Sequence, residues 1–133
     1  MARKLLDNTK VTFSIAPVVS TASANGTAVD TLGYNDGMLI VTAGVIDTAS
    51  GNETYAYSVE ESDDGSTGWV AVSGATGSIT ASSTTALIRV KELNLARKRY
   101  LRAVLTAGGT TPSIAQTAIF LLGEAFAGAV NND

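Results

Sequence analysis

The stretch MLIVTAGV at residues 38–45 is almost continuously apolar, and it decides the fold class. It is preceded by the turn-forming sequence YNDG at residues 34–37 and followed by the polar segment 47–52. A short apolar run between turn signals is typical of a buried strand. Because a strand with one solvent-facing side would alternate apolar and polar residues, we expect this strand to be central and covered on both faces.

Outward from this strand, the sequence consists of short β-type runs separated by turns. Val11, Phe13 and Ile15 alternate with polar residues at the period of a half-buried strand. An Asp and Gly-rich hairpin turn is expected at 62–68. The remaining runs are 27–32, 55–60, 69–72, a short strand around Ile79 within the Gly, Ser and Thr-rich segment 73–85, 87–90, 100–105 and 114–122. About eight short strands at this spacing predict an all-β fold, an antiparallel β-sandwich resembling a jelly roll.

The bulk composition fits one small domain. The chain has 133 residues, of which 45% are hydrophobic and 16% are charged, enough apolar material for a single core. We expect the sandwich at residues 11–122, an extended N-terminal arm at 1–10 and a C-terminal tail at 123–133. The start has no apolar run of the kind found in secretory signals, and the apolar stretch 115–130 is short and interrupted by Glu124, so we expect neither a leader nor a membrane contact.

The residue types exclude most catalytic chemistry. The chain has no histidine and no cysteine, which removes the commonest general base, thiol nucleophiles and the usual zinc ligands. Carboxylates cluster at residues 60–64, but Glu60 and Glu61 are adjacent on a strand and therefore point to opposite faces. We expect no enzyme activity and no cofactor. The sequence Asp63-Asp64-Gly65 is interpreted as a hairpin turn, with a loop calcium ion as the alternative.

The charges are unevenly distributed along the chain. Nine basic and twelve acidic residues give a net charge of −3, which argues against a nucleic-acid partner. Six of the nine basic residues lie between Arg89 and Arg102. This basic segment is either a solvated strand edge or a contact for an acidic protein neighbour. The candidate protein-interface residues come from both chain ends and from the basic run at 97–99 within this segment. They are Arg3, Lys4, Leu5, Leu6, Arg97, Lys98, Arg99 and Phe126.

Three aromatic residues form the candidate ligand platform. Trp69, Tyr55 and Tyr57 could stack on sugar rings, as in carbohydrate-binding modules. The alternative is packing in the core or at a protein interface, where Tyr and Trp are common.

Three stretches of the sequence carry a resemblance to a known group of proteins: VDTLGY at 29–34, YSVEESDDG at 57–65 with Trp69 and Val70 after it, and RYLRAVLT at 99–106. Over roughly residues 27–122 the chain resembles small virion proteins of tailed bacteriophages. The resemblance implies a β-sandwich, no catalytic residues, and a role as a decoration or cement protein on the phage head.

The expected function is that of a structural virion protein, made in the host cytoplasm and attached to the outer surface of the capsid. Its expected partners are the major capsid protein and further copies of itself as a homo-oligomer, and the expected effect is stabilisation of the head. Two alternatives remain open at this point: a structural protein of the head-to-tail junction or the tail, and a carbohydrate-binding module.

Overall fold

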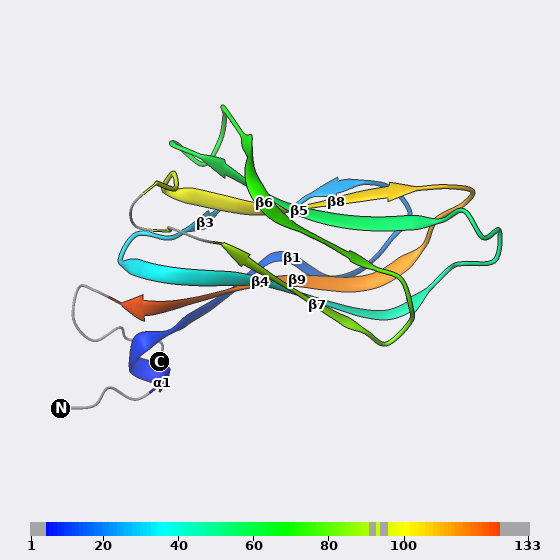
Figure 1. Cartoon of the computed structure of the whole chain (residues 1–133), viewed down its shortest axis with the longest axis horizontal. Helices are drawn as coiled ribbons and strands as arrows, with labels where there is room; N and C mark the ends of the chain where they lie inside the picture. The colour runs from blue at the N-terminus through cyan, green and yellow to red at the C-terminus, as the bar shows by residue number, and fades with distance from the viewer. Residues whose placement is uncertain (1–4, 91–92, 94–95, 126–133) are drawn as a thin grey trace.

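The protein is a sandwich of two antiparallel β-sheets, seen as two stacked layers in Figure 1. This computed structural model describes residues 5–90, 93 and 96–125. The predicted all-β sandwich is confirmed, with nine strands in the part of the chain described. No helix within those residues is long and apolar enough to cross a membrane.

The first sheet, here called sheet A, has the strand order β1-β9-β4-β7. Its strands are β1 (Lys10–Ser20), β9 (Ile114–Ala125), β4 (Tyr34–Ile46) and β7 (Thr85–Val90). A short helix, α1 (Leu5–Asn8), precedes β1. The first and the last strand of the chain are therefore hydrogen-bonded neighbours.

The second sheet, sheet B, has the order β2-β8-β5-β6, with β3 also paired to β8. Its strands are β2 (Ala24–Asn25), β8 (Tyr100–Gly108), β5 (Thr54–Ser62), β6 (Val70–Ile79) and β3 (Val29–Asp30). Among the neighbouring pairs, β5 and β6 are consecutive in the chain and form a hairpin. The other pairings in both sheets join strands that are distant in sequence.

The core lies between the sheets and is made of alternate residues of each strand. Its largest fully buried apolar side chains are those of Tyr57, Phe120, Leu39, Leu101, Leu105, Ile114 and Leu122. Two hydrogen bonds of buried polar groups join the two layers. The Tyr57 hydroxyl donates to Oε1 of Gln116 at 3.0 Å, and the hydroxyl of Ser14 in β1 accepts the backbone N–H of Ala103 in β8 at 2.9 Å.

The predicted central strand occupies its expected place but is not covered on both faces. β4 lies between β9 and β7, and Leu39 and Val41 are fully buried. Met38 and Ile40, which alternate with them, are half-buried on the other face, and Val45 is 75% exposed. The outward-facing residues of this run therefore form a second apolar surface, and no layer of the described chain covers that side.

Two predicted loops are strands. Residues 34–37, predicted as a turn, begin β4, because Tyr34 and Asp36 pair with the end of β9. Residues 73–79, predicted as a loop with a short strand, continue β6, and after an irregularity in register residues 76–79 pair with residues 55–58 of β5. Small residues are suited to this part of β6: a Cβ atom on Gly77 would lie 3.0 Å from Cγ1 of Ile88 in the opposite sheet.

Truncation of a central core residue tests this packing. Leu39→Ala removes a fully buried side chain between the sheets and should lower the free energy of unfolding by about 2–5 kcal/mol. The matched control is Leu32→Ala, because Leu32 is 65% exposed in the connection before β4 and should change stability by less than about 0.5 kcal/mol. Equal losses in urea unfolding of the two variants would contradict the assigned core.

Candidate functional site

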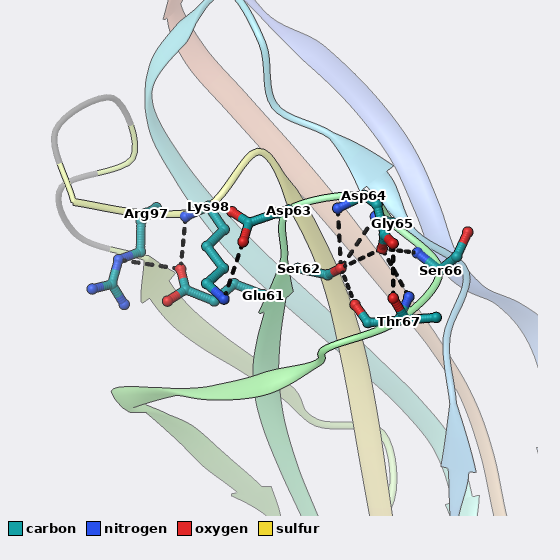
Figure 2. Close-up of polar contacts among 9 residues, drawn as sticks. All are labelled: Glu61, Ser62, Asp63, Asp64, Gly65, Ser66, Thr67, Arg97 and Lys98. Atoms are coloured by element: carbon teal, nitrogen blue, oxygen red, sulfur yellow. Dashed lines mark hydrogen bonds and ion pairs between the residues drawn. The ribbon is translucent and has the colours of Figure 1, made fainter.

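The carboxylate-rich segment at the end of β5 forms a closed turn. Figure 2 shows the Asp64 carboxylate inside this turn, where Oδ1 accepts the backbone N–H groups of Ser66 and Thr67, each at 2.8 Å. Oδ2 of Asp64 accepts the Thr67 hydroxyl at 2.7 Å. The Ser62 hydroxyl accepts the backbone N–H of Gly65 at 3.1 Å and donates to the carbonyl oxygen of Thr67. Gly65 has φ +74°, a conformation that favours glycine.

These hydrogen bonds account for the electrostatics of Asp64. The N–H groups of Thr67 and Ser66 and the Thr67 hydroxyl hold the pKa of this carboxyl far below its ordinary value, because they bond to the ionised form. Both carboxylate oxygens are used within the turn. Among the described residues, no group of three or more Asp, Glu, His or Cys side chains is arranged to hold a metal ion.

Arg97 and Lys98 of the basic run lie beside this turn and pair with the carboxylates of Glu61 and Asp63 (Figure 2). Oε2 of Glu61, which is buried, accepts the backbone N–H of Lys98 at 3.0 Å and lies 3.5 Å from Nε of Arg97. Nζ of Lys98 lies 3.4 Å from Oδ2 of Asp63. The end of β5 is therefore tied to the segment that leads into β8.

The neighbouring arginines are paired in the same manner. Arg99 donates to both carboxylate oxygens of Asp30, at 2.9 and 2.8 Å, and this contact holds the pKa of Asp30 below its ordinary value. Arg102 donates from Nε and Nη2 to Oε1 of Glu60, at 2.8 and 2.6 Å. These basic side chains bond within the molecule and do not form an unpaired cationic patch.

The two adjacent glutamates lie on opposite faces of β5, as the alternation of a strand predicts. Glu61 is buried against the Arg97 segment, whereas Glu60 faces outward beside Arg102. They therefore cannot act together as an acid and base pair on one substrate.

The structure does not bring the three candidate platform residues onto one surface. Tyr55 and Tyr57 are 2% and 1% exposed. The Tyr55 hydroxyl donates to the carbonyl oxygen of Asp47, and burial raises the pKa of Tyr57. Trp69 is half-buried, with the Arg102 guanidinium 4.4 Å from its ring centre. A three-ring sugar platform is therefore wrong, because period-2 alternation directs both tyrosines into the core.

The candidate interface residues at the chain ends lie partly outside the described residues. Arg3, Lys4 and Phe126 are outside them. Leu5 and Leu6 are exposed on α1.

The outward face of sheet A is an apolar surface that was not predicted from the sequence. One row across the four strands consists of Val11, Leu121, Met38 and Arg89. The next row consists of Phe13, Ile119, Ile40 and Leu87. Seven of these eight side chains are apolar, and Val11, Phe13 and Leu87 are exposed. We call these two rows the apolar rows. The sequence feature that indicates these rows is the continuous apolar run at 38–41. From the sequence alone, this run predicted a strand covered on both faces.

A shallow hollow of about 510 Å³ lies beside the apolar rows on the same sheet. Its lining includes Thr42 and Thr117, which pair with each other, and the small residues Gly44 and Ala115. A Cβ atom on Gly44 would lie 3.6 Å from Cβ of Ala115, so these two small residues are neighbours. On its two central strands, sheet A thus presents bulky apolar side chains at one part of its outer face and small ones at another, while Pro17, Val18 and Val19 of β1 line the hollow from the side.

The turn around Asp64 predicts a pH-dependent stability. Because the folded-state pKa lies below the unfolded value near 3.8, the stabilisation by Asp64 is complete above that value and is lost as the pH falls through the folded-state pKa. Asp64→Asn should therefore lower the thermal midpoint at pH 7, and the difference from the wild type should shrink in strong acid.

The neighbouring residue supplies the control for this measurement. Asp63→Asn removes an ion pair of a highly exposed carboxylate and should change the midpoint little. If Asp63→Asn and Asp64→Asn have the same effect at pH 7, the hydrogen bonds of Asp64 do not stabilise the turn.

Comparisons with known proteins identify the fold. No family model and no curated protein matches the chain. Among solved structures, the chain is similar to the PBSX exported protein XepA, with a TM-score of 0.57 and 17% sequence identity. The similarity covers 100% of this chain and 42% of XepA, so the chain spans less than half the length of that protein. At this identity, the likeness establishes a shared β-sandwich fold.

Proposed function

We propose that the protein is a non-enzymatic structural component of a bacteriophage particle. The form we favour is a capsid decoration protein that binds the major capsid protein lattice from the outside and stabilises the head. Its parts would act by contact with other proteins, with no substrate and no cofactor.

The observation that carries the proposal is the likeness of the whole described sandwich to XepA, a protein of phage PBSX. The sequence resemblance to small virion proteins over residues 27–122 points to the same class of phage-encoded sandwich. XepA is described as an exported protein, so attachment to the capsid is our extension from the sequence resemblance.

The physical properties of the molecule suit an architectural role. The turn at 62–68 is closed by its own hydrogen bonds, and Glu61, Asp30 and Glu60 each neutralise a neighbouring cation. Such a module presents fixed surfaces and gains little from rearrangement on binding. The outer face of sheet A is apolar, and exposed apolar patches mark protein contact sites. On a lattice, many individually weak contacts would add through multivalency.

The proposal is tested on purified particles of the encoding phage with and without the gene. We expect mass spectrometry to find the chain at a copy number comparable to that of the capsid protein, and electron microscopy to locate it on the head shell. Heads without the protein should release DNA at lower temperature, and added purified protein should restore their stability. Absence from the particle would overturn the proposal.

The same measurement separates the head from the tail. A copy number of about six or twelve, as ring symmetry gives, would contradict decoration of the head and support the head-to-tail junction or the tail. Leu32→Ala, an exposed change in the connection before β4 and outside the apolar rows, should restore heat stability as well as the wild type and serves as the control for substitution as such.

A further inference from the structure

The two sheets of the sandwich differ in what their outer faces present. On sheet B, Glu60 and Arg102 are cross-strand neighbours on the outer face and form an ion pair. On sheet A, the apolar rows occupy the corresponding positions, with Arg89 at the edge strand as their single charge. An antiparallel sheet with one face in water ordinarily alternates apolar and polar residues. The outer face of sheet A has the composition of a surface that another protein layer covers.

The bulky and small residues of this face are arranged about a central threonine row. Thr42 in β4 pairs with Thr117 in β9 and with Thr85 in β7. Two residues away along both central strands, on one side, lie the bulky neighbours Ile40 and Ile119. Two residues away on the other side lie the small neighbours Gly44 and Ala115, which line the hollow.

On the two central strands, β4 and β9, this arrangement is complementary to itself. A two-fold axis along the threonine row, in the plane between two facing sheets, exchanges the two sides of the row. It places Ile40 and Ile119 of one copy over Gly44 and Ala115 of the other, and the reverse. An isologous interface requires such self-complementarity, because one patch meets an identical patch. We propose that the outer face of sheet A binds the same face of a second copy of this chain to form a two-fold dimer.

The size and charge of the face agree with this occupant. Four strands about 4.8 Å apart and a paired length of about nine residues at about 3.3 Å per residue give roughly 600 Å² per copy. Two copies would then bury about 1,200 Å² in total, which is at the lower end of specific protein interfaces. Arg89 does not become an unpaired charge, because Nη2 lies 3.5 Å from Oδ2 of Asp36 at the edge of the face. The dimer is therefore expected to be of moderate affinity.

The dimer is tested with the purified full chain by sedimentation equilibrium over a range of concentrations. Wild-type protein should show a reversible monomer–dimer equilibrium. Leu87→Asp places a charge in an apolar row and should weaken the dimer at least tenfold. Leu32→Asp is the matched control, because both leucines are 65% exposed, and it should leave the equilibrium unchanged.

A second variant separates specific fit from general stickiness. Ala115→Leu makes the face more apolar but fills the hollow, so it should also weaken the dimer at least tenfold. Stronger association of Ala115→Leu would overturn the proposed register. Circular dichroism and thermal unfolding would check that each variant is folded. We expect them to fold, because these side chains point outward and not into the core.

Cross-linking tests the position of the axis. The chain contains no cysteine, so Thr42→Cys carries a single thiol beside the axis, where it faces its own symmetry mate. A short bismaleimide should join two copies through position 42 and not through Leu32→Cys. A chain that remains monomeric up to about 1 mM, or a dimer that cross-links equally at both positions, would overturn the proposal. These measurements use no phage particles, so their failure leaves the proposed attachment to the capsid standing.

Discussion

The pairing of β9 with both β1 and β4 is the interaction on which the rest of the structure depends. It joins the first and last strands of the chain and places β4 beside them in sheet A. Phe120 and Leu122 of β9 are fully buried against sheet B, while Ile119 and Leu121 face outward in the apolar rows. One strand therefore supplies both the core and the exposed surface. Sheet A is complete only when residues distant in the chain have met. Its formation therefore costs conformational entropy, because long loops must be closed.

Several elements were predictable because their signals are local. The alternation of Val11, Phe13 and Ile15 predicted a strand, and Asp and Gly residues predicted the turn at 62–68. The exposure of one face of 38–45 was not predictable, because an apolar outer face covered by its own chain and one left uncovered have the same sequence pattern. Within 73–79 only a short strand around Ile79 was predicted, since the Gly and Ser residues there have low intrinsic β propensity, and pairing with β5 overrides that preference.

The basic run shows why the candidate site was harder to predict than the fold. Arg99 and Asp30 are 69 positions apart in the sequence, and Lys98 and Glu61 are 37 apart, so no local pattern links them. Their contacts follow from the topology, because β3 and β5 both pair with β8. Such pairs add little net stability where they are exposed, but they fix which loop lies against which. The basic run at 97–99 therefore helps to fix the geometry at this end of the sandwich and does not form a free cationic surface.

The outer faces of the two sheets differ in how favourably they interact with water. Sheet B could expose its outer face indefinitely, because paired charges such as Glu60 and Arg102 remain hydrated there. Each exposed apolar side chain on sheet A instead forgoes about 25 cal/mol for every Å² left in water, without contributing to the core. The sandwich already has a complete apolar interior, so folding of a single copy does not require Val11, Phe13 or Leu87 to be apolar. The alternation that places them outward is satisfied equally well by threonine, which the adjacent row uses at Thr42, Thr85 and Thr117. Folding of a single copy therefore does not require apolar residues in two rows beside threonine in the third, and this choice agrees with the proposed contact of the face with a second copy.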